Sequence, residues 1–71
     1  MSNIEITEYK MAWTRNGLER INMILAFDQD GNLYQEFKDY KLEDEREILN
    51  AIKAVGCRAE YRSVTGQKVG A

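Results

Sequence analysis

Apolar and polar residues alternate through the first half of the chain, and this pattern predicts β-strands. The first alternating segment covers residues 3–14, with a change of phase near its middle that indicates a bulge or a bend. Two further segments cover residues 19–27 and 33–38. Asn16-Gly17 and Asp30-Gly31 separate the segments, and both pairs favour the positive backbone φ angles of hairpin turns. We therefore expect a three-stranded antiparallel meander.

The spacing of apolar residues changes after the third segment and predicts one amphipathic helix. The positions at helical spacing are mostly apolar: Leu42, Ile48, Leu49, Ile52 and Val55. Acidic residues occupy the first turns and Lys53 occupies the last, which suits the helix dipole. Asp39 is a candidate N-cap residue, and Gly56 is suited to the left-handed conformation that ends a helix.

Residues 58–64 form the last predicted strand, whose inner side carries Tyr61. The chain then has the order β-β-β-α-β, which is an α+β domain over residues 1–64 with the helix packed on one face of the sheet. Residues 65–71 are small, polar and glycine-containing, and we expect them to form a flexible tail. Placing the last strand beside the first gives an expected strand order of 3-2-1-4, with the helix as the crossover.

Composition limits the class of protein. The 71 residues make one small domain with a marginal core, so self-association is physically reasonable. A content of 44% hydrophobic and 31% charged residues is typical of a folded domain. The formal net charge of −2, from 10 basic and 12 acidic residues, lacks the basic footprint of a general nucleic-acid binder. No apolar run reaches the length of a membrane helix and the N-terminus lacks signal-peptide features, so we expect a cytoplasmic protein.

Residues that carry catalytic or metal chemistry are scarce. The chain has no histidine, which removes the commonest general base and the commonest metal ligand. The single cysteine, Cys57, follows the predicted helix at the end where the dipole opposes a thiolate, so we interpret it as structural. The segment from Asp28 to Asn32 departs from the EF-hand pattern and is better explained as a turn. We therefore expect no enzyme activity, no metal and no cofactor.

The sheet face that a single helix leaves uncovered is the main candidate for function. By the expected alternation, this face mixes apolar and polar residues, among them Ala12, Arg20, Ile24, Ala26 and Tyr34. An apolar surface rimmed by charge often marks a protein partner, and an edge strand can pair with another chain. The resulting hypothesis is a small protein-interaction module: an inhibitor, an adaptor or a homodimeric accessory protein, of the kind that phages and mobile elements encode.

The last strand and the tail support an alternative function. Arg58, Arg62 and Lys68 form a local excess of positive charge, and arginine beside an aromatic residue can bind phosphate or stack on a base. Tyr61 falls on the opposite face of the strand, so the simpler interpretation is cross-strand ion pairing with Glu8, Glu36 or Glu60. RNA or single-stranded nucleic-acid binding is therefore the alternative. A third hypothesis is a subunit whose stability depends on a larger assembly.

Overall fold

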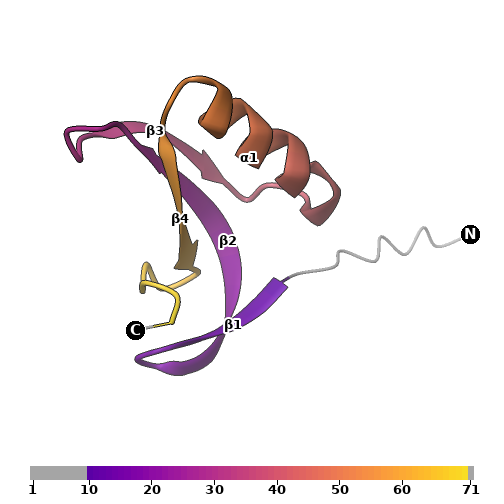
Figure 1. The fold of residues 1–71 in the computed structure, drawn as a ribbon. Coiled ribbons are helices and arrows are strands. Elements are labelled where there is room, and N and C mark those ends of the chain that lie inside the picture. The colour runs from indigo at the N-terminus through magenta and orange to yellow at the C-terminus, as the bar shows by residue number, and fades with distance from the viewer. Residues whose placement is uncertain (1–9, 71) are drawn as a thin grey trace, which may run out of the picture.

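The computed structural model describes residues 10–70 and shows one antiparallel sheet with a helix on one of its faces (Figure 1). The elements in chain order are β1 (Lys10–Thr14), β2 (Gly17–Phe27), β3 (Leu33–Lys38), a 3₁₀ turn (Leu42–Asp44), α1 (Glu45–Ala54) and β4 (Arg58–Ser63). The predicted α+β class and the order β-β-β-α-β are confirmed. The expected strand over residues 3–14 is observed from Lys10 onward, and its earlier part lies outside the described residues.

Strand β2 is the centre of the sheet. Ile21 pairs with Lys10 of β1 and with Ser63 of β4, so β1 and β4 lie on opposite edges of β2. Leu25 pairs with Glu36 of β3 and with Glu60 of β4, so β3 and β4 also lie on opposite edges of β2. β1 and β3 therefore follow one another along one edge of β2, and β4 occupies the other edge.

The expected strand order 3-2-1-4 is wrong, because β4 pairs with β2 and not with β1. The physical reason is the length of the strands. β1 has 5 residues and β2 has 11, so a strand beside β1 would leave most of one edge of β2 without hydrogen-bond partners. β4 follows that edge from Phe27 to Ile21.

An irregularity at Asn22 reverses the side-chain alternation of β2. Ile21 and Met23 are two residues apart, but their partners on β4 are adjacent, which is the pattern of a β-bulge. Lys10 is paired with Ile21, and its Nζ donates a hydrogen bond to Glu45 Oε1 of α1 at 3.0 Å. Ile21 therefore faces the helix side of the sheet. Beyond the bulge, the odd-numbered residues Met23, Leu25 and Phe27 face the opposite side.

The core lies between α1 and the half of the sheet away from the β1–β2 hairpin (Figure 1). Ile24 and Ala26 of β2 and Ile52 of α1 are buried. Other apolar side chains pack around them, namely Phe37, Tyr40, Ile48, Leu49, Cys57 and Tyr61. Cys57 is thus part of the packing, as predicted for a structural thiol.

The prediction that Ile24 and Ala26 lie on the uncovered face is wrong, since both have 0% exposure. Cross-strand pairing gives the reason. Ile24 pairs with Phe37 and Tyr61, whose rings pack under the helix, and the small Ala26 lets the helix approach closely. Met23, Leu25 and Phe27 consequently point to the opposite face.

The two ends of the helix are stabilised differently. Gly56 has φ 76°, its N–H donates to Lys53 O, and the next N–H donates to Ile52 O, which together form a Schellman motif. The prediction for Gly56 is confirmed. Asp39 is not the N-cap, because α1 begins only at Glu45. Asp39 instead adopts φ 52° and accepts a hydrogen bond from the Asn22 side chain at 3.1 Å.

The segment after β4 turns back onto the sheet. The N–H of Ser63 donates to Gln67 O at 3.0 Å, and Lys68 pairs with Arg62 in an antiparallel bridge. At the chain end, Gly70 N donates to Trp13 O of β1 at 2.8 Å. The part of the expected tail that the structure describes therefore has defined partners on β4 and β1.

Replacement of Ile24 tests the position of the core. We expect Ile24→Ala to lower the free energy of unfolding by about 2–5 kcal/mol, because a fully enclosed side chain leaves a cavity. Leu33→Ala serves as the control, since Leu33 is 54% exposed, and we expect a change of about 0.5 kcal/mol or less. Urea unfolding followed by circular dichroism measures both. If Ile24→Ala does not fold, Ile24→Val with an expected loss of about 0.5–1.5 kcal/mol replaces it. Equal small losses at the two positions would contradict the fold.

Candidate functional site

The sheet has an open face, defined here as the side opposite α1. Its centre consists of Met23, Leu25 and Phe27, whose neighbours along β2 point into the core. Leu25 is 9% exposed, and Met23 and Phe27 are half-buried. The surrounding side chains therefore cover part of Met23, Leu25 and Phe27. The groups most accessible to a ligand lie at the two ends of the open face.

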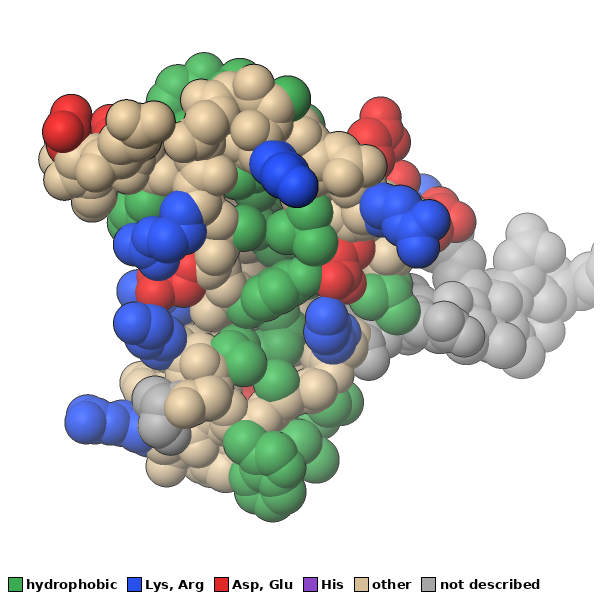
Figure 2. Space-filling model, viewed as in Figure 1, with side chains coloured by type: hydrophobic (Ala, Val, Ile, Leu, Met, Phe, Trp, Pro, Cys, Tyr) green, Lys and Arg blue, Asp and Glu red, His purple; other side chains and the backbone are tan. Residues whose placement is uncertain are grey.

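The end of the open face at the β1–β2 hairpin is apolar and exposed. We call Met11, Trp13 and Leu18 the hairpin patch; their exposed fractions are 51%, 69% and 53%. Trp13 pairs directly with Leu18, and Met11 pairs with Arg20, so the side chains stand on neighbouring strands of one face. Figure 2 shows apolar side chains gathered at this end of the molecule, below an apolar strip with charged side chains on both its sides.

A hydrogen-bonded polar cluster around Glu19 holds the hairpin in place. Glu19 of β2 accepts hydrogen bonds from the hydroxyls of Thr14 at 2.7 Å, Ser63 at 3.1 Å and Thr65 at 2.8 Å. Thr14 and Ser63 are 7% and 1% exposed. The hydrogen bond from Thr14 is the largest of several that lower the pKa of Glu19. The cluster joins β1, β2, β4 and the C-terminal segment, so the hairpin patch stands on a fixed support.

The other end of the open face carries the Glu60 cluster, which consists of Glu60, Arg58, Arg62 and Lys68. Nitrogen atoms of Arg62, Lys68 and Arg58 lie 2.8, 3.3 and 4.0 Å from the carboxylate oxygens of Glu60. Burial raises the pKa of Glu60, but hydrogen bonds from Arg62 and Lys68 outweigh it, so the net shift is downward. The Arg58 guanidinium also lies over the Phe27 ring, 4.9 Å from its centroid.

Another polar cluster, centred on Glu45, lies on the helix side of the sheet. Glu45 accepts hydrogen bonds from Lys10 Nζ and from the Tyr61 hydroxyl, and Lys10 Nζ lies 4.7 Å from the centre of the Tyr61 ring. Burial raises the pKa of Glu45, yet the two hydrogen bonds bring it below its usual value. Nearby, the Tyr40 hydroxyl is buried without a hydrogen-bond partner, and burial followed by the charge of Glu45 raises the pKa of Tyr40 to about 12.

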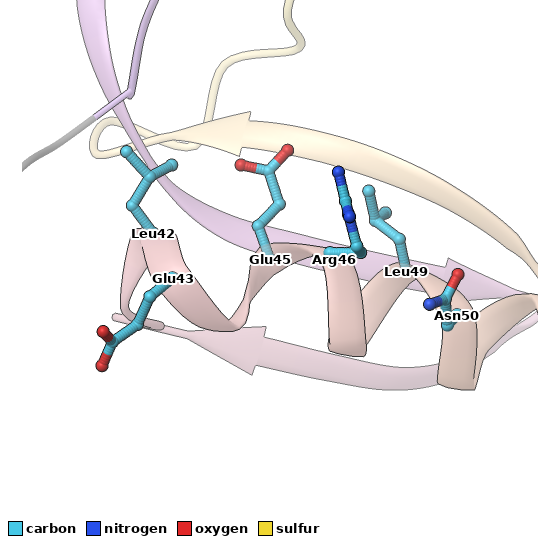
Figure 3. Close-up of a pocket in the computed structure, with 6 residues that line it drawn as sticks. All are labelled: Leu42, Glu43, Glu45, Arg46, Leu49 and Asn50. Carbon is cyan, nitrogen blue, oxygen red and sulfur yellow. The ribbon is translucent and has the colours of Figure 1, made fainter.

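A surface hollow of about 470 Å³ lies along α1 next to this cluster. Figure 3 shows Leu42, Glu45, Arg46 and Leu49 pointing to the side of the helix that faces β4, whereas Glu43 points away. Glu45 is already bound by Lys10 and Tyr61 as an ionised carboxylate. The hollow is lined by two glutamates, an arginine, an asparagine and two leucines, and these residues do not pair a base with a nucleophile.

The residues predicted for protein binding do not share one surface. Arg20 lies on the open face beside Met11, whereas Ala12 pairs with Glu19 on the helix side. Ile24 and Ala26 are in the core, and Tyr34 is 58% exposed near the register shift of β3. The phase reversal at Asn22 separates Arg20 from Ile24 and Ala26, which would otherwise share one face of β2.

The residues predicted for nucleic-acid binding do come together. Arg58, Arg62 and Lys68 surround one carboxylate, and Tyr61 lies on the opposite face, as expected from the alternation. The interpretation of these charges as ion pairs is confirmed for Glu60, although Arg58 and Arg62 meet it along β4 itself and not across strands. Glu36 pairs with Lys38 instead, and Glu8 lies outside the described residues.

The Asp28–Asn32 segment is a turn in which Asp28 Oδ1 accepts two backbone N–H groups, from Asp30 and Asn32, each at 2.9 Å. The Asp28 carboxylate therefore accepts hydrogen bonds within the turn, as aspartate commonly does in turns. Among residues 10–70, no group of three or more acidic or cysteine side chains is arranged to hold a metal ion.

Sequence reasoning missed two features: the hairpin patch and the two hydrogen-bonded carboxylates Glu19 and Glu45. The alternation of Met11 and Trp13 with Lys10 and Ala12 placed the first pair on one face. It did not tell which face the helix would cover. The carboxylates gave no sequence signal, because most of their partners are distant in the chain.

Comparison of the chain with protein-family models, curated proteins and solved structures found no significant match. In the described part of the chain, no helix has the length and apolar character needed to cross a membrane.

The two tyrosines beside Glu45 should respond in opposite ways to loss of the hydroxyl. We expect Tyr40→Phe to raise the free energy of unfolding by about 1 kcal/mol, because a buried hydroxyl without a partner is costly. Tyr61→Phe should lower it by a similar amount, because it removes the hydrogen bond to Glu45. Denaturant unfolding of the two variants and the wild type measures the difference. A loss at Tyr40 as large as the loss at Tyr61 would contradict the geometry.

Acid should destabilise the fold through Glu60. Its folded pKa lies below the ordinary value of 4.5, so its contribution is present above that value and is lost as the pH falls through the folded pKa. We expect the free energy of unfolding to decrease between about pH 5 and pH 3. Glu60→Gln should make this decrease smaller, and Glu47→Gln, at an exposed position on α1, should leave it unchanged. If the free energy of unfolding falls with pH equally in both variants, the Glu60 cluster does not stabilise the ionised form of Glu60 preferentially.

Proposed function

We propose that this protein is a small non-enzymatic interaction module that binds a partner protein through its open face, with the hairpin patch as the apolar part of the contact. The observation that carries the proposal is the pairing of Trp13 with Leu18, which sets two large side chains more than half exposed on one rigid surface. Met11 extends the same surface along β1.

The composition of this surface is the first support. Tryptophan, methionine and arginine are enriched at protein interfaces, and tryptophan and arginine supply many of the residues with large binding energies. Trp13, Met11 and the neighbouring Arg20 give the open face this composition.

The rigidity of the surface is the second support. The patch stands on paired strands, and the hydrogen bonds to Glu19 fix the hairpin against β4. A surface that is already ordered loses little conformational entropy on binding. The hairpin patch is therefore suited to be the preorganised part of an interface.

The roles we propose are those of an inhibitor or an adaptor in the cytoplasm, of the type found in phages and mobile elements. The chain lacks histidine, and its one cysteine lies in the packed core. The carboxylates Glu45 and Glu60 form ion pairs on opposite sides of the sheet. These groups stabilise the fold in a way that favours a binding role over a catalytic one.

Single-stranded nucleic acid is the second candidate partner. Arg58, Arg62 and Lys68 lie together on the open face, and Phe27 lies on that face under Arg58. Single-stranded nucleic acid binds to surfaces that combine aromatic rings with positive charge. The Glu60 carboxylate weakens this case, because it lies within the group of cations.

Replacement of Trp13 tests the proposed function. Immobilised wild-type protein should capture a partner from an extract of its native host, and Trp13→Ala should lose it, with a decrease in affinity of at least about 30-fold. Val55→Ala is the matched control, because Val55 is 55% exposed at the end of α1 and away from the patch. Denaturant unfolding checks that both variants keep the fold. Capture that depends equally on Val55 and Trp13, or on neither, would contradict the proposal, and a low-salt gel shift with a single-stranded oligonucleotide tests the second candidate.

A further inference from the structure

Charge is distributed unequally between the two sides of the sheet. The alternation of β2, β3 and β4 and the ion pairs place five cationic side chains on the open face: Arg20, Lys38, Arg58, Arg62 and Lys68. Two carboxylates accompany them, Glu36 and Glu60, which gives the open face a formal net charge of +3. Residues 10–70, which the structure describes, hold 10 basic and 10 acidic groups, so the described residues outside the open face carry a formal net charge of −3.

The Glu60 cluster has positive charge in excess. One carboxylate faces three cations; Arg62 at 2.8 Å and Lys68 at 3.3 Å both hydrogen-bond to it. The Arg58 nitrogen is 4.0 Å away, and the side chains of Arg58 and Lys68 are each 63% exposed. These two side chains can bind another carboxylate without breaking the pair between Arg62 and Glu60.

The distance between the two ends of the open face follows from the register. Leu18 belongs to the hairpin patch, and Met23, five residues further along β2, pairs with Arg62. At roughly 3.3 Å per residue, the separation from the hairpin patch along β2 is about 16 Å for Arg62 and about 30 Å for Arg58, which pairs with Phe27. This separation fits within one protein interface of ordinary size.

We propose that the partner of the open face is an acidic protein surface, with apolar side chains that cover the hairpin patch and carboxylates that bind Arg58 and Lys68. This inference rests on the proposed function and names the chemistry of its partner. The charge of the open face, opposite in sign to that of the whole chain, steers an acidic partner toward this side and away from the acidic helix side.

Two other occupants fit the same face less well. A second copy packed face to face would bring one surface of +3 against another, and like charges across an interface are unfavourable. Nucleic acid would place phosphates near Glu36 and Glu60, and two members of the hairpin patch, Met11 and Leu18, cannot stack on bases as aromatic rings do.

Selection from a displayed library of random peptides tests the proposal. We expect peptides enriched on the wild-type protein to be acidic and to contain large apolar residues. Their affinity should fall at least about 30-fold with Trp13→Ala and about tenfold at low salt with the double variant Arg58→Glu/Lys68→Glu. The double variant Lys41→Glu/Lys53→Glu makes the same charge change at exposed positions outside the open face and should bind as the wild type does.

The outcomes separate this inference from the proposed function. Neutral or basic peptides that need Trp13 but not Arg58 and Lys68 would overturn the acidic partner and leave the interaction module in place. A library that gives no peptide dependent on Trp13 would contradict both. Tighter binding of an oligothymidylate that is lost in Arg58→Glu/Lys68→Glu would assign the face to nucleic acid. A doubled solution mass that Trp13→Ala returns to the monomer would assign it to a second copy.

Discussion

The length of the helix relative to the central strand is the constraint on which the rest of this structure depends. β2 has 11 residues and spans about 36 Å, whereas α1 has 10 residues and spans about 15 Å. The helix therefore covers less than half the length of one sheet face. It packs where Ile24, Ala26 and Ile52 can meet, at the end of the sheet away from the β1–β2 hairpin (Figure 1). The hairpin end must be stabilised by something else.

Polar groups stabilise the hairpin end in place of a second helix. The bulge at Asn22 turns Ile21 and Glu19 to the helix side, where Glu19 accepts hydrogen bonds from Thr14, Ser63 and Thr65. The C-terminal segment completes this arrangement by pairing with β4 and reaching Trp13 of β1. Trp13, Leu18 and Met11 lie on the other face of the hairpin and remain exposed.

Much of the fold was predictable from sequence, and the faces of β2 were not. The turns, the third strand and the Gly56 stop depend on local chemistry, and they appear where the pattern placed them. β2 is apolar on both faces, and the count of apolar residues predicted that the face with Met23, Leu25 and Phe27 forms the core. In the structure the face with Ile24 and Ala26 forms the core, because Phe37 and Tyr61 lie beside Ile24 on the two neighbouring strands.

The candidate site was predictable only where charge alone defined it. Arg58, Arg62 and Lys68 were found because they are close in sequence. The hairpin patch was missed because its exposure depends on a bulge and on how far the helix reaches, and neither leaves a local signal. The two ends of the open face together define a surface with an apolar contact and positive charges that lie about 16 to 30 Å away along β2.

Tryptophan fluorescence of the isolated protein tests the central claim most directly, because Trp13 is the single tryptophan and is 69% exposed. At concentrations where the protein is monomeric, the account predicts emission close to that of free tryptophan in water and ready quenching by acrylamide. Emission shifted to shorter wavelength, together with protection from acrylamide in the folded monomer, would show that Trp13 is covered by its own chain and would contradict the account.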